Sequence, residues 1–248
     1  MANWKERLYK SYISSGQVKV HDDSDKMVLK NYKYYIRLIK KYIPKNYYLK
    51  ICDLGCGHGA LLYCLKEYGY RNIIGVDISK EQVSYAHKNG IYEVAEGEIN
   101  KFLERSDQIY DVVFLMDILE HLDKDEIFII LDLINTRLSD GGLLIIHVPN
   151  ADGIFGMKMR YGDFTHETCF NSDSLSQILH VCGFKDAKFI EDSPIVHGYI
   201  SFIRNILWNL LTLPYRLLAA SETGNFKRIL SQNMLAIAKK NNSNNPID

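Results

Sequence analysis

Apolar and basic residues alternate with helical spacing in the first fifty residues of the chain. One face collects Tyr32, Tyr35, Ile36, Ile39 and Ile43, and the opposite face collects Lys33, Arg37, Lys40 and Lys41. This separation predicts an amphipathic helix that ends at Pro44 and lies on the domain that follows.

Short apolar runs alternate with helical stretches from Lys50 onwards. The runs LKICDL, NIIGVD, YDVVFLM and LLIIHV are typical of buried strands, and helices are expected over about 124–138 and 172–181. Asp123 and Glu126 mark the start of the first of these helices. The alternation predicts βαβ units and a parallel sheet. Shorter strands are expected near 92–95 and 187–190, and the run MLAIA predicts a last strand, antiparallel at the sheet edge.

No repeat or linker divides the chain, so a single domain over 1–248 is predicted. It consists of a helical cap over 1–45, a core over 46–194, and C-terminal helices with the last strand over 195–248. The N-terminus lacks the apolar core of a signal peptide, and the apolar stretch 205–215 is too short to cross a bilayer. We therefore expect a cytoplasmic protein.

Composition narrows the class of partner. With 47% hydrophobic and 24% charged residues the chain is globular, and a net charge of zero argues against a nucleic-acid surface. Residues 1–50 nevertheless carry 12 Lys and Arg against 4 Asp and Glu, whereas 51–199 carry 12 against 24. Basic ends folded over an acidic middle favour an anionic substrate, although a solvated helix face explains the same pattern. The five cysteines lack metal-ligand spacing, so free thiols and no metal site are expected.

A glycine-rich turn follows the first predicted strand. It reads Asp53-Leu54-Gly55-Cys56-Gly57-His58-Gly59, with a shorter glycine spacing than the dinucleotide fingerprint. The carboxylate of Asp53 would repel a pyrophosphate but attract a ligand that carries an ammonium and a sulfonium. Asp77 ends the second strand, where an acid can accept hydrogen bonds from ribose hydroxyls. S-adenosylmethionine therefore fits better than NAD, although both acids could instead cap helices and Cys56 could be a small filler.

These residues resemble motif I of the class I S-adenosylmethionine-dependent methyltransferases, and further motifs of that family follow in order. They are IIGVDISKEQV, AEGEI, YDVVFLMDILEHL and LSDGGLLIIHVPN. The resemblance implies an α/β, Rossmann-like, mostly parallel sheet of seven strands with the last one antiparallel. It also implies S-adenosylmethionine as cofactor and S-adenosylhomocysteine as product. The cofactor-binding residues it implies are Asp53, Gly55, Cys56, Gly57, Gly59, Asp77, Ile78, Glu98, Ile99, Met116 and Asp117, with Glu120 and His121 facing the same mouth.

Three histidines lie where this family places its acceptor. His166 is the first candidate for the base that removes the acceptor proton, oriented by Asp163, and His121 is a further catalytic candidate. The alternative is that His166 only pins its loop to the sheet, and His147 is interpreted as a satisfied buried residue. The expected substrate-binding residues are Tyr161, Thr165, Asn150 and His197.

The segments 161–170 and 191–198 resemble methyltransferases of bacterial surface-polysaccharide gene clusters, for capsule or lipopolysaccharide. That resemblance implies O-methylation of a sugar, or of a phosphate-type substituent on one. C- or N-methylation of a quinone-like or keto-sugar molecule stays open, as does a non-catalytic cofactor-binding subunit. The role of the apolar segment 199–220 stays open: it could be a lid, a homodimer face, a weak membrane-surface contact or a helix that simply packs on the sheet. The expected oligomeric state is therefore a monomer or a homodimer.

Overall fold

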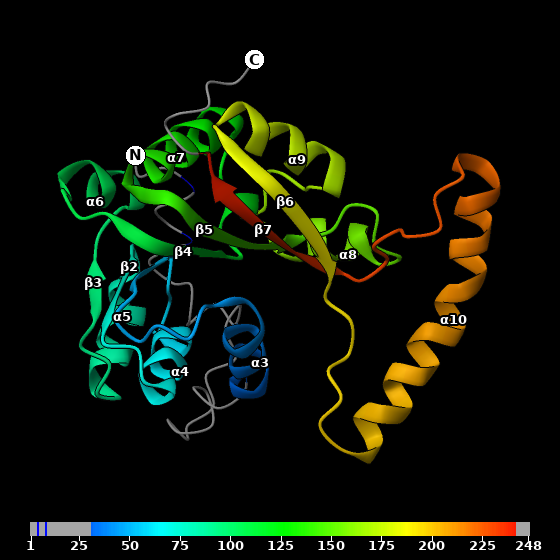
Figure 1. Ribbon diagram of the computed structural model, residues 1–248, viewed down its shortest axis with the longest axis horizontal. Coiled ribbons are helices and arrows are strands. Elements are labelled where there is room, and N and C mark those ends of the chain that lie inside the picture. Colours follow the sequence, from blue (N-terminus) through cyan, green and yellow to red (C-terminus); the bar gives the residue numbers. More distant parts are fainter. Residues whose placement is uncertain (1–3, 5–7, 9–30, 242–248) are drawn as a thin grey trace.

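The computed structural model describes Trp4, Leu8 and residues 31–241, and its centre is a seven-stranded sheet (Figure 1). The strand order is β3-β2-β1-β4-β5-β7-β6, and β7 runs antiparallel to both of its neighbours while the other pairs are parallel. This is the predicted α/β methyltransferase-type sheet. The strands are β1 Lys50–Leu54, β2 Asn72–Asp77, β3 Val94–Glu96, β4 Tyr110–Met116, β5 Leu138–Pro149, β6 Phe184–Glu191 and β7 Asn233–Lys240.

The place of β7 corrects the expectation of an edge strand. It lies between β5 and β6, with Ile237 opposite Ile145 and Leu235 opposite Ile190. Met234, Leu235 and Ala236 are consecutive and all buried, as in a strand covered on both faces. The edge is β6, whose burial pattern alternates instead.

Helices cover both faces of the sheet (Figure 1). One face carries α3 Tyr32–Tyr42, α4 Ala60–Tyr68 and α5 Lys80–Lys88, and the other carries α6 Ile99–Arg105, α7 Lys124–Arg137 and α9 Ser172–Val181. The predicted start of α7 is confirmed, because Asp123 and Glu126 form a reciprocal capping box. Between β4 and α7 lies the short 3-10 helix η1, Leu119–His121, and α8, Gly156–Gly162, follows β5.

Helix α3 is the described part of the predicted N-terminal cap. It buries Leu38 and Ile39 in the same apolar cluster as α4. The Tyr34 ring lies edge-on to the ring of His147 on β5, with centroids 5.9 Å apart. Helix α3 therefore reaches the carboxyl edge of the sheet, and residues 9–30 of the predicted cap lie outside the described residues.

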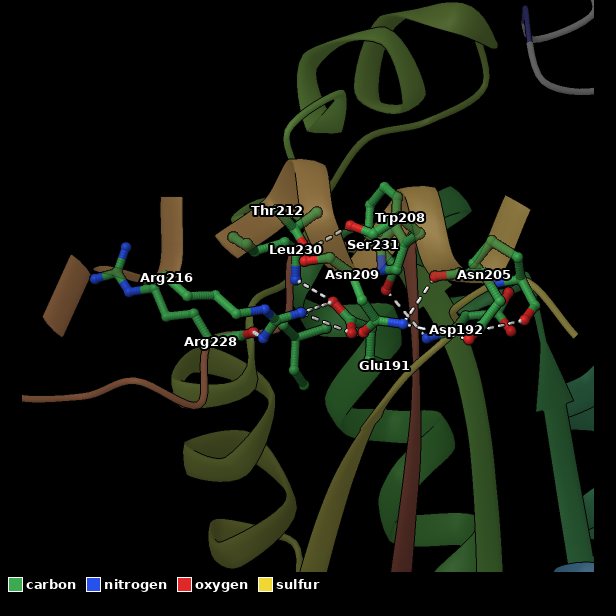
Figure 2. Close-up of polar contacts among 12 residues, drawn as sticks. Glu191, Asp192, Asn205, Trp208, Asn209, Thr212, Arg216, Arg228, Leu230 and Ser231 are labelled. Atoms are coloured by element: carbon green, nitrogen blue, oxygen red, sulfur yellow. Dashed lines mark hydrogen bonds and ion pairs between the residues drawn. The ribbon is translucent and has the colours of Figure 1, made fainter. Parts of the chain in front are cut away.

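Helix α10, Tyr199–Thr223, stands beside the body and turns its polar side inward (Figures 1 and 2). Its buried residues are Ser201, Thr212 and Ala219. Arg216 donates to both oxygens of Glu191 on β6, at 2.9 and 2.8 Å. Large apolar side chains point outward, and Ile200, Phe202, Leu210, Leu211, Leu217 and Leu218 are each more than half exposed. Among the described helices none is both long and apolar enough to cross a bilayer.

Candidate active site

The glycine turn after β1 brings backbone close to the carboxyl edge of the sheet. Gly55, Gly57 and Gly59 all have positive φ angles, of 74°, 54° and 78°. At Gly55 a Cβ atom would lie 2.0 Å from Cδ1 of Ile118, so only glycine fits this turn without displacing its neighbour. The turn thus packs its backbone directly against the Ile118 side chain.

Asp53 lies under this turn with a carboxylate that is 2% exposed. Its Oδ1 has no hydrogen-bond partner among the described residues. Burial, and then the nearby charge of Asp77, raises the pKa of Asp53 to about 8. An unpaired buried carboxylate oxygen fits a cationic group of a ligand, as the ammonium of S-adenosylmethionine would provide.

Asp77 ties the glycine turn to the end of β2. Its Oδ2 accepts from the Gly57 amide at 2.8 Å, and its Oδ1 accepts from the Ser79 amide at 2.8 Å. The cap of α5 is the Ser79 hydroxyl, which accepts from Gln82, so the alternative of Asp77 as the helix cap is wrong. A carboxylate has further lone pairs, which leaves Asp77 able to accept from ribose hydroxyls.

The remaining expected cofactor residues follow the neighbouring strands. Ile78 comes directly after β2 and its side chain is exposed. Glu98 precedes α6 and pairs with Lys101 at 2.6 Å, while Ile99 begins that helix. Met116 ends β4. Cys56 is packed against Gly75, and burial raises the pKa of its thiol, which fits a filler better than a nucleophile.

Asp117 and His147 form an ion pair at the ends of β4 and β5. Asp117 has a φ of 57°, unusual for a residue with a side chain, and its amide donates to the His147 carbonyl at 2.9 Å. The His147 ring contacts Asp117 Oδ1 at 2.6 Å and Asp192 Oδ2 at 3.4 Å. Burial opposes the charged ring, but Asp117 outweighs it and raises the pKa of His147 to about 10. His147 is therefore a satisfied buried residue that positions Asp117.

A second polar cluster, which we call the Glu120 cluster, consists of Glu120, His121 and His166. One ligand atom of each lies within 4.8 Å of the others. The two imidazole rings are edge-on, with centroids 4.7 Å apart. Burial, and then the neighbouring His166, lowers the pKa of His121 to about 4, so its ring is neutral at pH 7. The sequence indicated a place for Glu120 at the mouth but no chemical role.

The partner of His166 differs from the prediction. Its Nδ1 lies 2.8 Å from the carbonyl oxygen of Met159, whereas the Asp163 carboxylate accepts from the amide and hydroxyl of Thr165 at 2.9 and 2.6 Å. The Thr165 hydroxyl in turn lies 2.8 Å from Nδ1 of His121. Asp163 therefore orients His121 through Thr165, because the loop turns back on itself after α8.

The expected substrate-binding residues are not all available to a ligand. Asn150 is 1% exposed, and its amide donates to the carbonyls of Ile229 and Ser231, so it holds the loop before β7. Thr165 is buried and supports His121. Tyr161 and His197 are exposed. The corrections for Asn150 and Thr165 have one cause. Both side chains bind partners that only folding brings close, and such partners are not visible in the local sequence.

The sequence of the chain is similar to the sequences of known methyltransferases. The family model "Methyltransferase domain" matches residues 27–188. The chain is 30% identical over 139 residues to the mouse small RNA 2'-O-methyltransferase, covering 49% of this chain and 33% of that protein. It is 31% identical over 123 residues to the ubiquinone biosynthesis O-methyltransferase of Rickettsia prowazekii, covering 48% and 47%. The chain thus spans less than half the length of these curated relatives.

Solved structures share the fold. A SAM-dependent methyltransferase from Archaeoglobus fulgidus superposes with a TM-score of 0.62 at 24% identity, covering 87% of this chain and 97% of that one. Phosphoethanolamine N-methyltransferase 2 from Haemonchus contortus, in complex with S-adenosyl-L-methionine, gives 0.62 at 16% identity, covering 97% and 60%. At these identities the likeness concerns the fold.

Proposed function

Because the chain belongs to the class I S-adenosylmethionine-dependent methyltransferases, we propose that it transfers a methyl group from S-adenosylmethionine to an oxygen atom of a small molecule. The observation that carries the proposal is the unpaired, buried Asp53 carboxylate beneath the glycine turn, beside Asp77. S-adenosylhomocysteine is the product.

The residues of the cofactor side bind and orient. The cofactor supplies a methyl group on a sulfonium and the sulfide that leaves. Asp53 pairs with its ammonium group, Asp77 accepts from its ribose hydroxyls, and Gly55 lets it approach the backbone. Asp117, held by His147, lies at the neighbouring strand end and borders the mouth. These contacts fix the direction in which the methyl group faces the acceptor.

The Glu120 cluster forms the acceptor side in this proposal. His166 donates from Nδ1 to the Met159 carbonyl, which leaves its Nε2 free to accept. O-methylation needs the acceptor hydroxyl to lose its proton, and this cluster is a group of buried and half-buried polar side chains just beyond β4. Asp163 contributes by positioning His121.

An anionic sugar is the acceptor class that we favour. Lys33, Arg204 and His197 line one hollow between α3 and the start of α10, together with Tyr32 and Tyr34. Two cations there suit a phosphate-bearing or acidic sugar. The resemblance of segments 161–170 and 191–198 to methyltransferases of surface-polysaccharide clusters supports the same class.

Product analysis with an acceptor panel tests this function. The purified chain is incubated with S-adenosylmethionine and nucleotide-linked sugars, phosphorylated sugars or catechol-type quinone precursors. We expect S-adenosylhomocysteine and an O-methyl product from the first two sets, with His166→Asn inactive and His180→Asn, altered at an exposed site on α9, unchanged. A product methylated at carbon or nitrogen would contradict oxygen as the acceptor atom.

Membrane-surface contact through α10 is a second part of the proposal. The outward face of α10 is apolar, and Arg204, Lys227 and Arg228 nearby complement anionic headgroups. We expect the protein to float with vesicles of anionic phospholipid, whereas Leu210→Glu combined with Leu211→Glu stays in the dense fractions. Both residues are more than half exposed, so the change leaves the core intact. A natural chain that remains entirely in the dense fractions contradicts the contact.

A further inference from the structure

Two segments far apart in sequence build the Glu120 cluster. Glu120 and His121 lie on η1 directly after β4, and His166 comes from the loop after α8. That loop is fastened to η1 by two backbone hydrogen bonds, because the amides of Glu167 and Thr168 donate to the Glu120 carbonyl at 2.7 and 3.1 Å. The cluster is thus held from both sides.

The hydrogen bonds around the cluster fix which nitrogen of each imidazole carries the proton. The Thr165 hydroxyl gives its hydrogen to Asp163, so it accepts from Nδ1 of His121. A carbonyl oxygen can only accept, so Nδ1 of His166 donates to Met159. In neutral imidazoles both Nε2 atoms therefore keep a lone pair.

Glu120 adds an oxygen that is also without a donor. Its side chain is 1% exposed, and Oε2 has no hydrogen-bond partner among the described residues. A buried carboxylate oxygen with no partner is costly, and two imidazole lone pairs nearby cannot supply a proton to it. The three side chains together offer acceptors and no donor that would satisfy them.

We infer that Glu120, His121 and His166 bind a divalent transition-metal ion at the acceptor mouth. Two imidazole nitrogens and one carboxylate oxygen suit zinc, manganese, iron or cobalt, and they leave other positions of the ion open. Ligand atoms at about 2.1 Å from a tetrahedral ion are about 3.4 Å apart, so an inward movement of the side chains closes a set whose atoms lie within 4.8 Å of one another. The bonds from His121 to Thr165 and Asp163, and from His166 to Met159, are the outer contacts that orient ligand histidines.

The role of the ion in methyl transfer rests on the proposed function. Bound to the acceptor oxygen, it would lower the pKa of the hydroxyl, so that the proton passes to solvent. The oxygen then forms its bond to the methyl carbon while the carbon–sulfur bond breaks and its electron pair stays on sulfur. His166 is then a metal ligand and not the proton acceptor.

Cobalt titration of the chelator-stripped protein tests the site without any acceptor. We expect one Co²⁺ per chain, with visible absorption bands of nitrogen and oxygen coordination, displaced by Zn²⁺. Glu120→Gln and His166→Asn should weaken binding by at least about a hundredfold, and Thr165→Val, which removes an outer contact, by about tenfold or more. His180→Asn is the matched control and should bind like the natural chain. Thermal unfolding of each variant shows that it is folded.

Two results would overturn the site. One is a folded natural chain that takes up less than one equivalent of Co²⁺ and Zn²⁺, as it would if a proton occupied Glu120. The other is binding that Glu120→Gln and His166→Asn leave unchanged, or that shows thiolate charge-transfer absorption. Because S-adenosylmethionine binding is measured separately on the same samples, loss of the metal site and failure of the methyltransferase function are distinguishable.

Discussion

The Asp53→Asn variant is expected to fold at least as stably as the natural chain and to lose most of its affinity for S-adenosylmethionine. Asparagine has the same size, so the buried site keeps its packing. It cannot provide the negative charge that the ammonium group of the ligand requires. We expect affinity to fall by at least about a hundredfold, close to 3 kcal/mol.

The same residue makes binding depend on pH. Asp53 has a pKa of about 8 in the folded protein, so near pH 7 most of it is protonated before the ligand arrives. A cationic ligand requires the carboxylate, and binding therefore releases a proton. The affinity of the natural chain should rise about tenfold per pH unit between pH 6 and 8 and level off above, whereas that of Asp53→Asn should not show this rise.

The contribution of Asp53 to folding stability falls with rising pH, whereas the affinity for S-adenosylmethionine rises. The pKa of Asp53 in the folded protein lies above the ordinary aspartate value of 3.8, so the folded state holds this proton more tightly than the unfolded chain. The contribution of Asp53 to stability is present below pH about 4 and is lost as pH rises towards 8. Calorimetric binding and urea unfolding across this range check both effects. An Asp53→Asn chain that binds the ligand like the natural one would contradict the assignment of Asp53 to the ammonium group.

The second large effect is expected from Asp77→Ala. The substitution removes the acceptor for the Gly57 and Ser79 amides, which shape the glycine turn, and the acceptor proposed for the ribose hydroxyls. A hydrogen bond to a charged group contributes about 1.5–3 kcal/mol, so the loss of two such bonds to the ribose should weaken binding by more than about a hundredfold.

Calorimetry with S-adenosylmethionine and S-adenosylhomocysteine measures this loss. Asp77→Asn is the control, because its carbonyl retains one acceptor and should leave intermediate affinity for both ligands. Because the role proposed for Asp77 is to bind the ribose, which both ligands share, the two ligands should lose affinity equally. A loss confined to S-adenosylmethionine would assign Asp77 to the charged end of the ligand instead.

Local patterns predicted most of the sheet and the positions of the expected cofactor residues at strand ends. The apolar runs identified the strands, the capping residues identified α7, and Asp53 and Asp77 stand at strand ends because each directly follows a buried run. These features depend on neighbours in sequence, whose spacing is visible in a single chain.

Contacts between segments distant in sequence could not be predicted in this way. The partner of Asp163 proved to be Thr165, Asn150 holds the loop before β7, and Glu120 meets His166 across more than forty residues of chain. The inward polar side of α10 is equally non-local, because Arg216 meets Glu191 on β6. From composition, the segment 199–220 stayed open between a lid, a homodimer face, membrane-surface contact and simple packing.

The place of β7 has a consequence for biosynthesis. The strand that separates β5 from β6 comes after both of them in the sequence, so a nascent polypeptide that has already made both still lacks the element between them. Until Asn233–Lys240 leaves the ribosome, β5 and β6 have unpaired edges facing each other and the sheet cannot close. Completion of the sheet therefore waits for the synthesis of β7, and termination before Asn233 removes an interior strand.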